Sequence, residues 1–180
     1  DVDMVIGVEF SSSYVFTNES ELEEVASNLT SLDGVEKVHS AVTEDVVINN
    51  ARTGLFSLSN VALGFPDAAV LTFGGFRSDG VPIDVAPSSG QAYVPEVLAR
   101  DIDASEGDIV VLLRGNSTLP LTVTMIVDGD GLGAYSLSGS GFSSSYTVFV
   151  NKTDLQTWTG NLGRSNLLFV SLDHQVPTDR

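Results

Sequence analysis

Helical periodicity is confined to two stretches of this chain, one near each end. In the first, five apolar residues recur at spacings of three and four and form one stripe: Leu22, Val25, Ala26, Leu29 and Leu32. Gly34 follows as a stop signal. In the second, Leu155 and Trp158 share a helical face, and Gly160 ends the segment. The chain therefore predicts a long helix near its start and a short one near its end.

Both helices have N-cap signals. The first offers two capping-box pairs, Asn18 with Glu21 and Ser20 with Glu23, and acidic residues crowd its first turn. The second offers Asn151, with Asp154 three residues on. Asparagine and serine oxygens accept hydrogen bonds from the free N–H groups of a first helical turn, so each helix is expected to begin at these residues.

Strand-type sequence surrounds both helices. Residues 4–10, 14–16 and 35–48 flank the first, and residues 146–150 and 166–172 flank the second. Between 51 and 145, short β-type runs at 69–73, 109–113 and 121–127 alternate with turn signals at Asp79-Gly80, Arg114-Gly115-Asn116 and Asp128-Gly129. Pro95 begins one helical turn over Glu96–Arg100.

This arrangement predicts an α+β fold. Two β-α-β units from the chain ends, residues 1–50 and 146–180, form one α/β subdomain, and residues 51–145 form a small inserted β-rich subdomain. A chain of 180 residues is long enough to bury a substantial core.

The formal net charge of −16 excludes nucleic acid and other polyanions as partners, because the long-range field repels them. Hydrophobic residues make up 42% of the chain, which excludes an acidic disordered tail. Of the 24 acidic residues 15 are Asp, and Lys37 and Lys152 are the only lysines. Such a surface suits very salty water, where counterions screen carboxylate repulsion. We therefore predict a halophilic source.

Cysteine is absent, so no disulfide and no thiol site forms. The chain has no apolar stretch of the ~20 residues that cross a bilayer and no leader-like start. It opens at Asp1 in a strand-like run and stops at Arg180 just after another, as expected for a soluble piece of a longer protein.

Catalytic signals are scarce. His39 and His174 are the only histidines, neither adjoins a nucleophile motif, and both are expected in surface or turn positions. Asp128-Gly129-Asp130-Gly131 resembles a calcium loop superficially, but Gly139 stands where its last ligand belongs, so a hairpin turn is expected. No catalytic residue, metal or cofactor is therefore predicted.

Four sequons are present, at Asn18, Asn28, Asn116 and Asn151. Asn18 and Asn151 are also expected helix caps, a role that a glycan hinders. Asn28 on a polar helix face and Asn116 in a hairpin turn are therefore the better candidate N-glycosylation sites.

Three segments resemble a known family. They are Gly34-Val35-Glu36-Lys37-Val38 after the first helix, the stretch from Tyr93 to Arg100 leading to Glu106-Gly107-Asp108-Ile109-Val110, and the stretch from Tyr146 to Leu155 leading to Asn166-Leu167-Leu168-Phe169-Val170. In order and layout they are similar to the extracytoplasmic core domain of FtsX-like, MacB-type ABC transporter permeases. The polar tail from Asp173 to Arg180 departs from the family, whose members usually continue with a helix.

The resemblance implies a porter-like α/β layer with an inserted β-rich subdomain. It implies a non-catalytic domain at the extracellular face of the membrane, moved by a cytosolic ATPase subunit and working beside a second permease chain. That motion drives substrate extrusion or extraction, or signals to an outside partner. The isolated domain is expected to be monomeric.

Two other functions stay open: a free-standing secreted or cell-surface binding module of a halophile, and an enzyme whose site forms only in space. Phe65, Phe73, Phe76 and Phe142 are candidates for an exposed partner surface, although the core of the β-rich subdomain is the favoured place for them.

Overall fold

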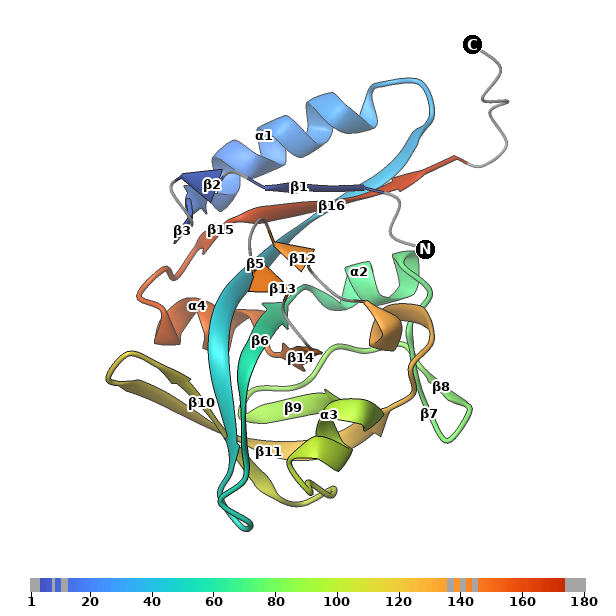
Figure 1. Ribbon diagram of the computed structural model, residues 1–180. Helices are drawn as coiled ribbons and strands as arrows, with labels where there is room; N and C mark the ends of the chain where they lie inside the picture. Colours follow the sequence, from blue (N-terminus) through green and yellow to red (C-terminus); the bar gives the residue numbers. More distant parts are fainter. Residues whose placement is uncertain are drawn as a thin grey trace.

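Six strands of the protein close into a β-barrel (Figure 1). The computed structural model describes residues 4–7, 9–10, 13–135, 138–139, 142–143 and 146–173. The barrel strands follow the order β5-β10-β11-β9-β14-β6, and β6 pairs back with β5. They are β5 (Val35–Asn50), β6 (Phe56–Gly64), β9 (Gln91–Pro95), β10 (Ile109–Arg114), β11 (Ser117–Val127) and β14 (Tyr146–Val150). β11 lies parallel to β9 and β14 to β6, and the other neighbours are antiparallel.

β5 extends beyond the barrel at its N-terminal end. Its first part, Val35 to Ala41, pairs with β16 (Leu167–Leu172), which in turn pairs with β1 (Met4–Gly7). We call these three paired segments the extension. The helix α1 (Glu19–Thr30) runs alongside the extension and packs on β5 (Figure 1). One continuous strand of 16 residues therefore belongs to both the barrel and the extension.

The remaining elements are short. The helices are α2 (Asp67–Thr72), α3 (Glu96–Asp101), α4 (Lys152–Trp158) and the 3-10 helix η1 (Gly131–Ala134). The strand pairs are β7 (Phe76–Ser78) with β8 (Val81–Ile83), β4 (Thr17–Asn18) with β15 (Arg164–Ser165), β2 (Glu9–Phe10) with β3 (Ser13–Tyr14), and β12 (Ser138–Gly139) with β13 (Phe142–Ser143). No helix among the described residues is long and apolar enough to span a bilayer.

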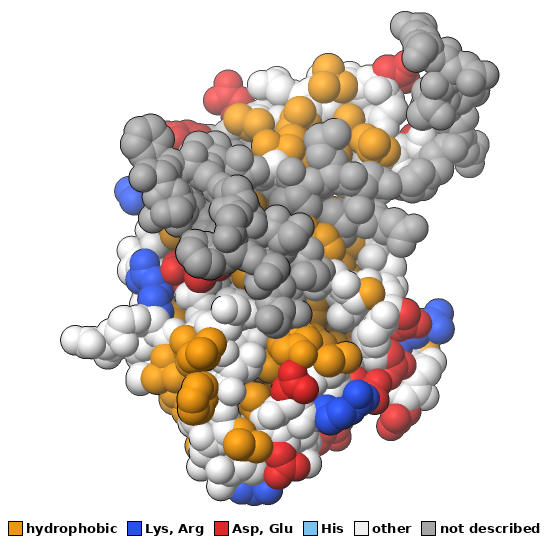
Figure 2. All heavy atoms as spheres, in the orientation of Figure 1, with side chains coloured by type: hydrophobic (Ala, Val, Ile, Leu, Met, Phe, Trp, Pro, Cys, Tyr) orange, Lys and Arg blue, Asp and Glu red, His pale blue; other side chains and the backbone are white. Residues whose placement is uncertain are grey.

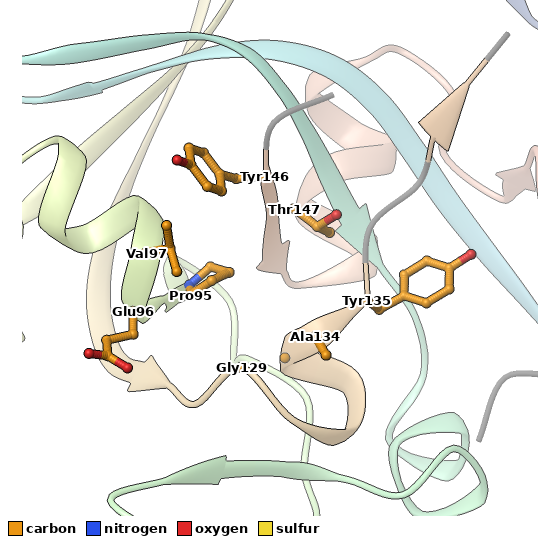
Figure 3. Close-up of a pocket in the computed structure, with 9 residues that line it drawn as sticks. Pro95, Glu96, Val97, Gly129, Ala134, Tyr135, Tyr146 and Thr147 are labelled. Atoms are coloured by element: carbon orange, nitrogen blue, oxygen red, sulfur yellow. The ribbon is translucent and has the colours of Figure 1, made fainter. Parts of the chain in front are cut away.

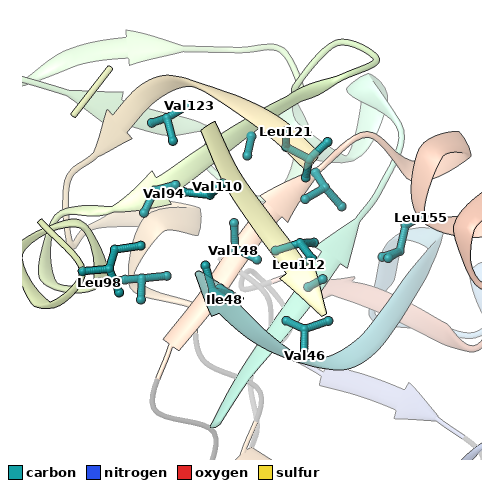
Figure 4. Close-up of a cluster of buried hydrophobic side chains, with 14 of the residues drawn as sticks. Val46, Ile48, Val94, Leu98, Val110, Leu112, Leu121, Val123, Val148 and Leu155 are labelled. Atoms are coloured by element: carbon teal, nitrogen blue, oxygen red, sulfur yellow. The ribbon is translucent and has the colours of Figure 1, made fainter. Parts of the chain in front are cut away.

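The barrel interior is a packed core of aliphatic side chains (Figure 4). Alternate residues of each strand point inward, as the period of two in a β-strand requires. Leu98 of α3 and Leu155 of α4 lie on opposite sides of this cluster. The inward-pointing residues are Val46, Ile48, Ala62, Ala92, Val94, Val110, Leu112, Leu121, Val123, Val148 and Val150, and all are buried.

A second core, rich in aromatic rings, lies between the extension and the outer face of barrel strands β6, β9, β11 and β14. Phe76 contacts Phe149 with ring centroids 4.7 Å apart, and Phe65 stacks on Phe76. Phe73 packs on Phe169 of β16. Phe65, Phe73 and Phe76 are thus core residues, as favoured from the sequence, whereas the side chain of Phe142 lies outside the described residues.

The run 69–73, which the sequence predicts as a strand, forms the helix α2 instead. Ala69, Val70 and Phe73 are buried while Leu71 is 64% exposed, a pattern that follows the helical period. Pro66 caps the helix and Asp67 lies in its first turn, where the helix dipole favours a negative charge. A short apolar run does not by itself separate a strand from a helix, which explains the error.

Three other expectations need correction. Asp128-Gly129 is not a hairpin turn, because β11 is followed by η1. Asn18 is the N-cap of α1 but makes no side-chain capping hydrogen bond, so neither predicted capping box explains this helix start. The signals of the second helix are confirmed: Asn151 caps α4 through its side chain, and Gly160 follows it with positive φ. α1 ends earlier than predicted, at Thr30, so Leu32 of the apolar stripe and the stop signal Gly34 lie beyond its end.

Candidate functional site

A pocket of about 270 Å³ opens where β14, α3, η1 and the end of β11 meet (Figure 3). Its lining is mostly apolar: Pro95, Val97 and Ala134 contribute carbon atoms, and Tyr135 and Tyr146 border it. Among the described lining residues Glu96 is the one carboxylate, and it is paired with Arg100 at 2.9 Å. A pocket of this size holds one large side chain or a small molecule, which is less than most ligand sites offer.

Two of the polar side chains around this pocket have partners outside the lining: Glu96 pairs with Arg100, and Tyr146 with Asp101. The hydroxyl of Tyr146 donates to a carboxylate oxygen of Asp101 at 2.5 Å, and this bond raises the pKa of Tyr146 above its usual value. The side chain of Thr147 is buried, and its hydroxyl has no hydrogen-bond partner. The described lining therefore offers an apolar surface for binding and no nucleophile paired with a base.

A second polar cluster joins α1, α4 and β15 at one end of the barrel. The carboxylate of Glu19 lies 2.6 Å from the Lys152 ammonium and accepts from Gln156 and Ser165, both at 3.0 Å. Lys152 also donates to the hydroxyl of Ser40 on β5 at 2.8 Å. Burial acts to raise the pKa of Glu19, but these donors outweigh it and hold the pKa below its usual value. One of the only two lysines thus ties α1 to the barrel.

The Gly107-Asp108 motif also has a structural role. Asp108 accepts from Arg52 at 2.9 Å and from the backbone N–H of Ser105 at 2.9 Å, and both contacts lower its pKa. Buried Asn50 donates to the carbonyl oxygen of Asp103 at 2.8 Å and accepts from the N–H of Arg52. The motif therefore fastens the hairpin after β5 to the start of β10.

The remaining sequence candidates lie apart from one another. His39 on β5 is half-buried against α2, where its Nε2 lies 3.0 Å from the hydroxyl of Thr72. His174 lies outside the described residues. Asp128 accepts from the backbone N–H groups of Asp79 and Gly80 and so secures the turn between β7 and β8.

The four sequon asparagines occupy three kinds of position. Asn28 is exposed on α1, and Asn116 is exposed in the turn between β10 and β11. Asn18 is exposed at the start of α1. The amide of Asn151 is engaged twice, since it caps α4 and donates to the carbonyl oxygen of Pro87 at 3.1 Å. Among the four, only the Asn151 side chain has these hydrogen bonds, and Asn18 is exposed, as are Asn28 and Asn116, so the choice between these three stays a prediction.

No sequence pattern pointed to the pocket. Tyr135 and Tyr146 flank the segment between η1 and β14, and Val97 follows Pro95 on α3. These residues meet only because β14 and β9 are neighbours in the barrel, a long-range pairing that no local spacing encodes.

The fold matches those of two solved extracytoplasmic domains. The periplasmic region of MacB from Actinobacillus actinomycetemcomitans superposes with a TM-score of 0.59 at 12% identity, over 97% of this chain and 75% of that one. The extracellular domain of the noncanonic ABC-type transporter YknZ from Gram-positive bacteria gives 0.52 at 12% identity, over 95% and 83%. No protein-family model and no curated protein matches the sequence. At this identity the likeness establishes the fold, a mixed α+β architecture built around a barrel.

Proposed function

We propose that this chain is the extracytoplasmic domain of an ABC transporter permease subunit, and that it acts by motion and recognition without catalysing a reaction. The observation that supports this most is the match to the MacB periplasmic region over 97% of the chain. The three segments that resemble this family in the sequence point the same way.

The path of the chain also supports the proposal. β1 and β16 are antiparallel neighbours, and Met4 pairs with Val170. The chain therefore enters and leaves at the same end of the extension, where β5 also begins at Val35 opposite Leu172. A domain inserted between two membrane helices needs such adjacent ends. We call this the membrane end.

β5 offers a route for mechanical coupling. Sixteen strand residues at a rise of ~3.3 Å each span roughly 50 Å, from the membrane end to the hairpin after Asn50. Strands pair with β5 along most of this length. In the proposed transporter, a cytosolic ATPase would open and close the membrane part, and the barrel would rotate with it as a rigid body. A second permease chain would lie beside it.

The proposed division of the chain follows the elements. The extension and α1 come from residues 1–50 and 146–180 and would form the porter-like layer. Four barrel strands come from residues 51–145, which would form the β-rich subdomain, while β5 and β14 link the two parts.

We also infer that the acidic surface adapts the domain to high salt, and that Asn28 and Asn116 are glycan acceptors. The absence of a glycan at both, by mass spectrometry of native material, would refute the second inference.

Membrane anchoring and sidedness test the main proposal. These 180 residues contain no cysteine, so Ser117→Cys, exposed at the start of β11 with its sequon intact, adds one label site to this domain in the full-length natural protein, and the unsubstituted protein is the control for labelling elsewhere. We expect a membrane-impermeant maleimide to label intact cells as strongly as permeabilised ones, with the label kept in washed membranes. Labelling only after permeabilisation contradicts the proposal. Release of labelled protein into the medium instead supports the alternative, a free-standing secreted binding module.

A further inference from the structure

One wall of the barrel is apolar on its outer face. On β10, Val110 and Leu112 point into the core, so Ile109, Val111 and Leu113 point outward. Ile109 is 48% exposed and Phe56 on β6 is 61% exposed. Hydrophobic side chains gather over the lower left of the molecule in Figure 2, where Figure 1 shows β5, β6 and β10.

Strand register makes these residues neighbours. Asn49 pairs with Phe56 on one side and with Val111 on the other, and Val111 pairs with Pro120. Val47 pairs with Leu113 in the next row. We call this set the barrel wall: Val47, Asn49, Phe56, Ile109, Val111, Leu113 and Pro120, with Leu58 at its border, 67% exposed.

The barrel wall carries no charge. None of its eight residues is ionisable, although 24 of the 180 residues of this chain are acidic and the net charge is −16. Over most of its surface, an approaching second copy would bring carboxylates face to face. At the barrel wall it would bring apolar groups together, and long-range repulsion weakens as salt screens it.

We propose that the barrel wall is a contact surface for a second copy of this chain, related by a two-fold axis. An isologous contact requires a surface compatible with itself, and an uncharged sheet face on an acidic protein meets that requirement. Because the wall runs along β5, an axis parallel to that strand places both membrane ends on the same side. This last point, and the membrane anchoring of both chains considered below, rest on the proposed function.

The contact is weak in solution. Eight residues are fewer than the 20–30 a side of a standard interface. The chain is therefore a monomer when dilute and pairs when concentrated, with higher affinity at high salt. Two chains anchored in one membrane reach high effective concentrations, at which a weak contact is populated.

Sedimentation at increasing protein concentration, in low and in molar KCl, tests the pairing. We expect concentration-dependent dimerisation that strengthens with salt, and a dissociation constant at least about tenfold higher in Phe56→Asp. Leu71→Asp is the matched control, because Leu71 is 64% exposed on α2, away from the wall. A protein that stays monomeric in molar salt refutes the proposal, as does an equal effect of both substitutions.

Cysteine cross-linking gives a second test of the pairing. It does not use Phe56→Asp and is therefore independent of any loss of stability in that variant. Asn49→Cys lies at the centre of the wall, and Ser88→Cys is an exposed control outside it. Oxidation should link the Asn49→Cys chains into dimers and leave the Ser88→Cys chains as monomers. Equal linking of both contradicts the proposal. The maleimide labelling experiment requires no dimer. A failure of the pairing proposal therefore leaves the proposed permease function standing, and the reverse also holds.

Discussion

The side chain of Asn166 takes the place of a strand beside Thr43. Its Nδ2 donates to the Thr43 carbonyl oxygen at 2.8 Å, and its Oδ1 accepts from the Thr43 N–H at 2.9 Å. Thr43 lies between the part of β5 that pairs with β16 and the part that pairs with β10. One amide therefore satisfies backbone groups that would otherwise be buried without a partner.

Replacing Asn166 by Leu should lower the free energy of unfolding by about 2–4 kcal/mol, because two buried backbone groups lose their partners. Asn166→Asp should also destabilise, since a carboxylate cannot donate to the Thr43 carbonyl. Urea unfolding measures both changes. The control Asn116→Ala, in an exposed turn, should stay within about 0.5 kcal/mol of wild type. Equal stability of Asn166→Leu and the control would contradict the role assigned here.

Replacing each of the two N-cap asparagines by Ala should change the free energy of unfolding by different amounts, when the protein is made in a host that adds no glycans. Asn151→Ala removes two capping hydrogen bonds and should cost about 1 kcal/mol. Asn18→Ala removes no side-chain capping bond and should cost clearly less. Thermal or urea unfolding compares the pair, and a larger cost at Asn18 would overturn the assignment.

Two glycines near η1 give a steric test. A Cβ at Gly133 would overlap the carbonyl oxygen of Asp128, whereas a Cβ at Gly129 would meet nothing within 4 Å. Neither residue has a positive φ, so strain of the left-handed region does not enter. Gly133→Ala should destabilise by about 1–3 kcal/mol and Gly129→Ala should be nearly neutral by the same measurement. Similar effects would show that the loop relaxes freely.

His39 should make stability depend on pH near neutrality. Burial, helped by the positive charges of Lys37 and Lys152, lowers the pKa of His39 below its usual value of 6.5. The unfolded chain then takes up a proton more readily than the folded one, so stability is full above this value and falls as pH drops through it. His39→Gln should show a smaller loss between about pH 8 and pH 5.5. Parallel curves for the two proteins would refute this role.

Salt should stabilise the protein strongly if its acidic surface is an adaptation to salt. Screening weakens repulsion among the 24 carboxylates, so the melting temperature should rise steeply between about 0.1 and 2 M KCl. Sorbitol at matched osmolarity controls for general solute effects. A melting temperature that does not change would require a functional explanation for the acidic surface.

Local signals were enough to predict several elements. The α4 start at Asn151 follows from capping chemistry, and the strands at 146–150 and 166–172 follow from β-branched and aromatic runs. The strand prediction for residues 69–73 was wrong because a run of five residues, four of them apolar, fits the period of a helix as well as that of a strand. Closure of the barrel needed pairings such as Val148 with Ala62, which lie 86 residues apart, and no local pattern encodes them. The pocket beside Tyr146 was missed for the same reason.

The pairing of Met4 with Val170 has an evolutionary consequence. A folded unit whose two ends meet can be spliced into a loop of another protein at little entropic cost, since the loop it occupies is already almost closed. Such a unit can be inserted into different host proteins without disturbing the fold that receives it.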